Sequence, residues 1–311
     1  MSVPVVKPRA VSPGGRIAVI APASNAKPER IKGGIAALQK YGYKVEPTEH
    51  ASGKVTPYFS GTPEERLEDL HGAFADPEIE AIFCTRGGYG SNYLLEDLDL
   101  DLIAENPKPL FAYSDLTIVQ TLLLDELGLV GFHGPMVAAD FYREGAIDEA
   151  SFADSLSGGK VTAGGPQGLR ILRPGRAQGI VHGGCLSMLV STLGTPFAPQ
   201  TEGRLLFIED VGAKPYQIDR MLRQMVLAGK FDGVTGFIFG EMLECVSPGT
   251  SPDLLDQVIL RVLDWFEGPI AIGLRSGHVS HSNVTLPLGI EAELAAEDEP
   301  ILSYLESAVV P

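Results

Sequence analysis

The chain has 311 residues, of which 44% are hydrophobic and 21% charged, a composition typical of folded proteins and a length that suits two domains. Its 24 basic and 40 acidic residues give a formal net charge of −16, which repels phosphate backbones and anionic lipids. Nucleic acids and membrane surfaces are therefore not expected as partners, and no apolar run approaches the ~18–20 residues needed to cross a bilayer.

The first apolar run covers residues 17–20, directly after Arg16. It is too short for the apolar core of a signal peptide and predicts a buried β-strand instead. The three cysteines, Cys84, Cys185 and Cys245, are an odd number without paired spacing, so neither a disulfide framework nor a zinc site is indicated. We expect a reducing, cytoplasmic setting.

From residue 16 to about residue 132, short apolar runs alternate with helical patterns, which is typical of βαβ units and a parallel sheet. Such short strands are typical of sheets covered on both faces. Thr62 is the expected N-cap of the second helix, with Pro63 in its first turn. The predicted strands are residues 17–20, 43–45, 80–84, 110–112 and 129–132, and the predicted helices include residues 29–41 and 63–74.

The periodicity fades between residues 140 and 175, where glycine and proline are frequent. We predict an N-terminal domain over residues 1–140, a linker over residues 141–175 and a C-terminal α/β domain over residues 176–311. The acidic tail, residues 290–305, is expected to form one or two closing strands with a solvated edge. Strands are predicted at residues 178–181, 204–208, 234–239 and 270–272, and helices at residues 185–193, 215–228 and 252–266.

Ligands of open parallel sheets bind beyond the carboxyl ends of the strands, so the residues after each apolar run are the ones to examine. The first such segment is Arg86-Gly87-Gly88-Tyr89-Gly90. Its glycines could expose backbone N–H groups to an anion, and they could equally form a tight strand-to-helix turn. The segment lacks the Gly-Lys-Ser/Thr ending of a phosphate-binding loop.

A second segment runs from Ala112 through Ser114 and Asp115 to Thr117, where a strand gives way to a helix. A serine at such a turn can be presented above the sheet edge as a nucleophile. Serine and aspartate at a helix start are more often N-caps, and these six residues alone favour the N-cap interpretation.

A third strand ends in Glu209 and Asp210, and successive side chains of a strand face opposite ways. One carboxylate is expected to cap the helix near residue 215 and the other to be solvated; alternatively, one could orient a histidine. His278 lies in a loop after the last predicted strand, a suitable position for a general base. Spacing cannot choose it over three other histidines, which are His133, His182 and His281.

Together these segments resemble the LD-carboxypeptidase family of serine peptidases, the muramoyltetrapeptide carboxypeptidases of cell-wall recycling. The resemblance runs from about residue 16 to residue 289. Several matching blocks in order are more specific than any one of them. The matching blocks are residues 86–90, 113–117, 132–136, 183–184, 193–197, 209–212, 215–216, 218–222, 277–278 and 286–289.

The resemblance implies a triad in which Ser114 is the nucleophile, His278 the general base and Glu209 the group that orients the imidazole. It also implies an oxyanion hole formed by the backbone N–H groups of Gly88 and Asp115. The implied fold is a flavodoxin-like, parallel-sheet N-terminal domain plus a smaller C-terminal α/β domain, with the site between them. A homodimer that needs no metal or other cofactor is expected.

The implied reaction is hydrolysis of the L,D amide that releases terminal D-alanine from murein tetrapeptides. A carboxypeptidase must bind a free carboxylate, for which an arginine is suited, and Arg86 and Arg275 are the candidates; a surface or structural ion pair is the alternative for each. Three other functions stay open: a self-immunity peptidase of the same fold that cleaves a peptidyl-nucleotide antibiotic, a non-catalytic peptide-binding module, and an enzyme with Cys84 or Cys185 as nucleophile.

Four residues depart from the family pattern. Ala112 replaces the usual glycine before the Tyr-Ser-Asp step, which is compatible with a methyl group only where φ is negative. Cys185 replaces a common asparagine, and Arg275-Ser276 replaces a more apolar pair. The triad residues themselves are intact.

Overall fold

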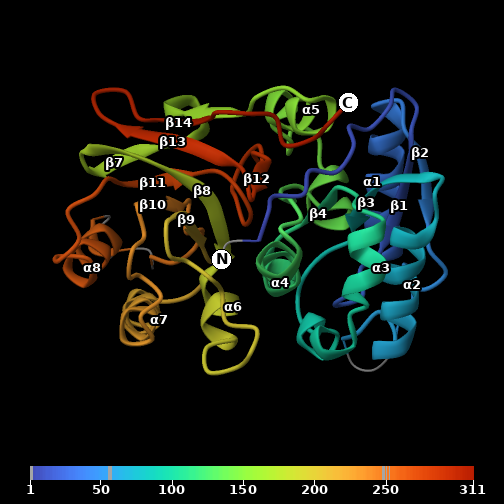
Figure 1. Cartoon of the computed structure of the whole chain (residues 1–311), viewed down its shortest axis with the longest axis horizontal. Coiled ribbons are helices and arrows are strands. Elements are labelled where there is room, and N and C mark those ends of the chain that lie inside the picture. The colour runs from blue at the N-terminus through green and yellow to red at the C-terminus, as the bar shows by residue number, and fades with distance from the viewer. Residues whose placement is uncertain (1–2, 55–57, 247–248, 250, 252) are drawn as a thin grey trace.

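The computed structural model describes residues 3–54, 58–246, 249, 251 and 253–311, and its strands form two sheets that lie side by side (Figure 1). The first sheet has the order β12-β5-β4-β3-β1-β2. Its members β1 to β5 pair in parallel, and β12 joins β5 antiparallel. These strands are β1 (Arg16–Ile20), β2 (Lys44–Pro47), β3 (Ile79–Cys84), β4 (Leu110–Ala112), β5 (Gly131–His133) and β12 (Leu286–Leu288).

The parallel order 2-1-3-4-5 is the flavodoxin-like order, so this part of the predicted fold class is confirmed. In that order the chain reverses direction between β1 and β3, and ligands bind beyond the carboxyl ends of the strands at that point. The core of this sheet includes a stack of phenyl rings from three neighbouring strands: Phe83 and Phe132 flank Phe111 with centroid distances of 4.3 and 4.8 Å.

Helices cover both faces of the first sheet (Figure 1). The predicted cap of the second helix is confirmed: Thr62 Oγ1 accepts from the backbone N–H of Glu65, and the Glu65 carboxylate accepts from the N–H of Thr62. This reciprocal pair satisfies two of the N–H groups that a helix start leaves free. The helices of this part are α1 (Pro28–Lys40), α2 (Pro63–Ala75), α3 (Leu100–Glu105) and α4 (Thr117–Leu127).

The second sheet has the order β6-β14-β13-β8-β9-β10-β11-β7. Its centre, from β8 to β11, is parallel, and the remaining strands join antiparallel. The strands are β6 (Thr162–Gly164), β7 (Arg170–Arg173), β8 (Gly175–Cys185), β9 (Arg204–Glu209), β10 (Gly236–Gly240), β11 (Ile270–Leu274), β13 (Glu291–Ala296) and β14 (Ile301–Tyr304). The helices are α5 (Glu149–Ser157), α6 (Leu186–Ser191), α7 (Pro215–Leu227) and α8 (Leu254–Val262); the predicted first residue of the last helix, Pro252, lies outside the described residues.

The structure differs from the sequence predictions in how the second sheet is completed. Residues 141–175, expected as a linker, contain α5 and both edge strands, β6 and β7. Because β6 pairs with β14, the expected solvated edge of the tail is wrong. Strand β12 returns from the C-terminal half to the first sheet. It has only three residues, which is too short a pattern for the sequence to predict this crossing. The division into two domains stays a prediction. No helix within the described ranges is both long and apolar enough to span a membrane.

A buried hydrogen bond joins the two halves. His182 of β8 lies 2.9 Å, through Nε2, from Asp125 Oδ1 of α4, and both side chains are buried. The other oxygen of Asp125 accepts from the backbone N–H of Gln200 at 2.9 Å. Both oxygens of this carboxylate therefore bind the C-terminal half.

We predict that Asp125→Ala lowers the free energy of unfolding by about 3 kcal/mol, because it leaves the buried ring nitrogen of His182 and the backbone N–H of Gln200 without an acceptor. The measurement is urea denaturation. Asp256→Ala is the control, since its partner Arg170 is largely exposed and the pair should contribute less than about 1 kcal/mol. Equal losses in the two variants would contradict the assigned role of Asp125.

Candidate active site

Ser114 lies in a tight turn between β4 and α4 and has a left-handed backbone, with φ of 65°. This conformation is unusual for a residue with a side chain, and at a strand-to-helix turn it is the geometry that presents a nucleophile. No side chain caps α4, and the Asp115 carboxylate instead accepts from the N–H of Ser91 at 2.8 Å. The N-cap interpretation of this segment is therefore wrong. Ala112 belongs to β4, outside the left-handed positions, so its methyl group is tolerated.

The loop after β3 packs directly against this turn. A Cβ on Gly87 would lie 2.7 Å from Ser114 Cβ, 2.9 Å from its Oγ and 3.0 Å from the backbone nitrogen of Asp115. Gly88 has φ of 110°, and Ser24 Oγ accepts from the next N–H, that of Tyr89, at 3.1 Å. Only glycine at position 87 allows this close approach of the loop to the serine.

Glu209 and His278 form the second part of the site. The Glu209 side chain is fully buried at the end of β9, and its Oε2 lies 2.8 Å from His278 Nδ1 and accepts from the His278 backbone N–H at 3.1 Å. Two contacts to one residue fix both the position and the orientation of the imidazole. With Nδ1 bound to the carboxylate, Nε2 is the ring nitrogen left for proton transfer. Asp210 is also buried and caps α6, accepting from the N–H of Ser187 at 2.9 Å, so the expected cap at α7 and solvated carboxylate are both wrong.

Glu209 and His278 each stabilise the charged form of the other. Burial alone would lower the pKa of His278, but the charge and hydrogen bond of Glu209 outweigh it and raise the pKa above 6.5. Burial would raise the pKa of Glu209, but the interactions with His278 outweigh it and lower the pKa. Glu209 is therefore ionised at neutral pH, and His278 changes its charge above pH 6.5.

Ser114 and His278 line one cavity of about 350 Å³, together with Gly87 and Gly88. In the described part of the chain no hydrogen bond joins Ser114 to His278 directly, although the two side chains face the same space. Such contacts are often long in unliganded enzymes and tighten when substrate binds.

The cavity is cationic although the protein is acidic. Its basic lining residues are Lys27, Arg30, Arg86 and Arg143, whereas no carboxylate of the described residues lines it. Arg86 is exposed and lines the cavity, and its substrate-binding role stays a prediction. Arg275 does not line the cavity and instead donates to the carbonyl of Pro166. The sequence prediction does not include Lys27 and Arg30, although both follow β1 and so lie beyond the carboxyl end of a strand. Arg143 lies in the segment predicted as a linker.

The competing histidines and thiols have other environments. His133 is buried beside the Glu209 carboxylate, its Nδ1 lies 2.9 Å from Ser276 Oγ, and burial lowers its pKa to about 4. His182 binds Asp125, and His281 is exposed. Burial raises the pKa of the thiols of Cys84 and Cys185, which keeps them protonated and argues against a thiolate nucleophile. The described residues contain no cluster of three or more side chains placed to hold a metal ion.

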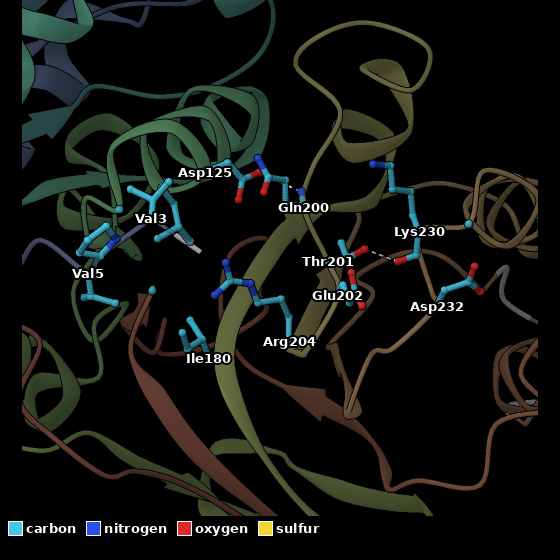
Figure 2. Close-up of a pocket in the computed structure, with 15 residues that line it drawn as sticks. Val3, Val5, Asp125, Ile180, Gln200, Thr201, Glu202, Arg204, Lys230 and Asp232 are labelled. Atoms are coloured by element: carbon cyan, nitrogen blue, oxygen red, sulfur yellow. Dashed lines mark hydrogen bonds between the residues drawn. The ribbon is translucent and has the colours of Figure 1, made fainter. Parts of the chain in front are cut away.

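A larger cavity of about 810 Å³ lies elsewhere between the two halves (Figure 2). Asp125 of α4 and Arg204 of β9 line it, together with Val3 and Val5 near the N-terminus. Figure 2 shows the Arg204 guanidinium directed into this space. The cavity contains none of the predicted site residues. Strand β9 thus begins at this cavity and ends at Glu209.

The chain is similar to known proteins in both sequence and structure. The LD-carboxypeptidase N-terminal domain model matches residues 17–134, which contain Ser114, and the C-terminal domain model matches residues 178–294, which contain Glu209 and His278. The probable murein peptide carboxypeptidase of Bacillus subtilis (strain 168) is 36% identical over 292 residues, 93% of this chain and 91% of that protein. The microcin C7 self-immunity protein MccF of Escherichia coli is 29% identical over 316 residues, 90% of each. The crystal structure of muramoyltetrapeptide carboxypeptidase from Oxalobacter formigenes superposes with a TM-score of 0.83 and 26% identity, covering 95% of this chain and 100% of that one.

We predict that Gly87→Ala slows labelling of Ser114 by a fluorophosphonate probe roughly 100-fold, because its methyl group would displace the serine. Gly72→Ala is the matched control: nothing lies within 4 Å of its added methyl group in α2, so labelling should be unchanged. The rate of covalent labelling is measured by intact-protein mass spectrometry. Unchanged labelling of Gly87→Ala would show that the loop does not constrain the nucleophile.

Proposed function

The chain belongs to the LD-carboxypeptidase family and is a serine-type carboxypeptidase, and from this premise we propose that it releases terminal D-alanine from murein tetrapeptides by cleaving the L,D amide. The observation that carries the proposal is the cation-lined cavity onto which Ser114 and His278 both open. A murein tetrapeptide ends in a free carboxylate, and a site lined by four basic side chains suits such an anion.

In the proposed reaction Ser114 Oγ attacks the carbonyl carbon of the scissile amide while His278 Nε2 accepts its proton. Glu209 holds the ring through Nδ1 and stabilises the imidazolium. The backbone N–H groups of Gly88 and Asp115 are the proposed oxyanion donors, each of which would contribute about 3–4 kcal/mol to transition-state stabilisation. His278 then protonates the departing D-alanine, and water, deprotonated by the same imidazole, releases the acyl group from Ser114.

Arg86 is the proposed partner of the terminal carboxylate, because it lines the cavity and has no ion-pair partner among the described residues. Arg143 instead binds Asp140 at 3.1 Å, and the Arg30 guanidinium lies over the Tyr142 ring at 4.8 Å. A homodimer and a cytoplasmic location stay predictions from the sequence. The relative MccF supports a second candidate, cleavage of a peptidyl-nucleotide antibiotic.

We predict that incubation with L-Ala-γ-D-Glu-meso-diaminopimelate-D-Ala yields a tripeptide and free D-alanine, detected by mass spectrometry. The Ser114→Ala variant should release none above background, because it lacks the nucleophile. A tetrapeptide ending in L-alanine is the control for the L,D linkage and should remain intact. Failure of the wild-type protein to release D-alanine, or cleavage of another bond, would contradict the proposal.

We predict that kcat/KM for the tetrapeptide increases with pH through an apparent pKa above 6.5, because the general base must be neutral and Glu209 raises the pKa of His278. Glu209→Gln should reduce kcat roughly 1,000-fold or more and move this acidic limb to lower pH, because burial then acts on His278 without the carboxylate. Glu241→Gln is the control, since its carboxylate accepts from the Ser280 N–H and it is no member of the triad. A limb that stays at the same pH in Glu209→Gln would assign it to another group.

A further inference from the structure

A second imidazole, that of His133, lies at the catalytic pair and has no role in the proposed reaction. His133 ends β5, where its backbone pairs with Ala112 of β4 on one side and Leu286 of β12 on the other. Its side chain is fully buried, and its ring lies 5.0 Å from that of Phe207 and 5.8 Å from that of Tyr113. The ring is therefore held firmly by the first sheet, beside a carboxylate that belongs to the second.

Two buried polar atoms at this contact have no hydrogen-bond partner among the described residues. They are Nε2 of His133 and Oε1 of Glu209. Both side chains border Gly277, since a Cβ on this glycine would lie 2.8 Å from His133 Cε1 and 2.8 Å from Glu209 Cδ. Nε2 is bonded to that Cε1 and Oε1 to that Cδ, so a possible donor and a possible acceptor lie at the same narrow space. A buried carboxylate oxygen without a donor is costly, and Glu209 Oε2 already accepts twice from His278.

The surroundings of His133 determine which of its nitrogens carries the proton. Burial lowers its pKa to about 4, so the ring is neutral near pH 7 and has one N–H. Ser276 Oγ lies 2.9 Å from Nδ1 and 3.4 Å from the carbonyl oxygen of His133, so Nδ1 is the nearer acceptor for the hydroxyl proton. The ionised carboxylate of Glu209 favours a proton on the other nitrogen. The favoured tautomer therefore has Nδ1 as an acceptor and an N–H at Nε2.

We propose that His133 is a positioning residue of the triad, whose Nε2–H is the donor for Glu209 Oε1 and holds this carboxylate in place behind His278. This inference rests on the proposed function. Each carboxylate oxygen then has its own imidazole partner. Because His133 is neutral, it supplies a donor without a positive charge that would repel the imidazolium of His278. His133 is also paired with β4, the strand that leads to Ser114, so the contact fixes Glu209 relative to the proposed nucleophile.

Loss of this donor should act in the opposite direction to loss of the carboxylate. Without the Nε2–H, the negative charge of Glu209 is less well compensated and attracts a proton on His278 more strongly, so the pKa of His278 rises further. The acidic limb of the reaction then moves to higher pH, whereas Glu209→Gln moves it to lower pH. The other titratable or charged groups around the pair are unchanged in a His133 variant; they are Cys185, Asp210, Tyr113, Asp140 and Arg143.

The test measures the rate of Ser114 labelling by a fluorophosphonate probe against pH, a readout that needs no peptide substrate. The proteins compared are the wild type, His133→Phe, His133→Asn and His133→Gln. Phenylalanine keeps a packed ring without a donor, asparagine replaces only the atom at Nδ1, and glutamine places an amide N–H near Nε2. We expect the acidic limb of the first two variants about one pH unit higher with a roughly tenfold lower plateau, and that of His133→Gln near the wild-type pH.

Two further measurements complete the test. His281→Phe is the control, because His281 is exposed and its profile should match that of the wild type. Nitrogen NMR of the wild-type protein with isotope-labelled histidine reports the tautomer directly. The signals that are lost in His133→Gln should belong to a neutral ring that is protonated at Nε2 and does not titrate near neutral pH.

The possible failures are distinguishable. A limb of His133→Phe at the wild-type pH or below it would overturn the inference, and so would a proton on Nδ1 of His133 in the wild type. An equal shift in all three His133 variants would overturn it by assigning His133 to packing alone. If His133→Phe does not fold, as circular dichroism would show, the comparison of His133→Asn with His133→Gln decides. No labelling of the wild type would overturn the proposed triad together with this inference, whereas labelling without D-alanine release would overturn only the proposed substrate.

Discussion

The hydrogen bond between Glu209 and His278 is the contact on which the candidate site depends. It lies within the C-terminal half, whereas the serine belongs to the first sheet, so the pair is useful only if the two halves hold a fixed relation. Two features provide that relation: β12 pairs with β5 in the first sheet, and Asp125 binds His182 across the boundary. Helix α4 carries Ser114 just before its first turn and Asp125 in its last. The helix that follows the proposed nucleophile is thus itself fixed to the opposite half.

The cavity shows why net charge is a poor guide to a substrate. A formal charge of −16 predicts repulsion of anions at long range, and screening limits that field to about 10 Å at ordinary ionic strength. Within the cavity the nearest charges determine whether an anion is attracted, and these are basic side chains beyond the carboxyl ends of the strands. The net negative charge still disfavours polyanions such as nucleic acids, which must contact a wide area of the protein. A small anion that fits inside the cavity meets only the cationic lining.

Local sequence patterns predicted most of the first sheet, because short apolar runs bounded by glycine and proline are visible without knowledge of the fold. They could not predict β12, whose three residues join a sheet formed more than a hundred residues earlier, or the edge strands β6 and β7 in a segment rich in turn-forming residues. The same limit applies to the site. Six residues around Ser114 favour an N-cap, and only its positive φ, a property set by the turn and the glycine loop packed on it, distinguishes a presented nucleophile from a cap. The triad was predicted only through the resemblance to a family, because that resemblance rests on all the matching blocks together.

Glycine has a further role in this site, since Ser114 and the Glu209–His278 pair of the proposed triad each pack on one. A Cβ on Gly240 would lie 2.6 Å from Glu209 Cβ, and one on Gly277 would lie 2.8 Å from both Glu209 Cδ and His133 Cε1. Gly87 stands in the same relation to Ser114. Dense packing of this kind leaves each reactive side chain few alternative rotamers, so its position is fixed before substrate binds. At positions 87 and 240 glycine therefore matters for its small size, because a larger residue would displace the neighbouring side chain. Gly277 is required for its size and also for its backbone, which has φ of 89°.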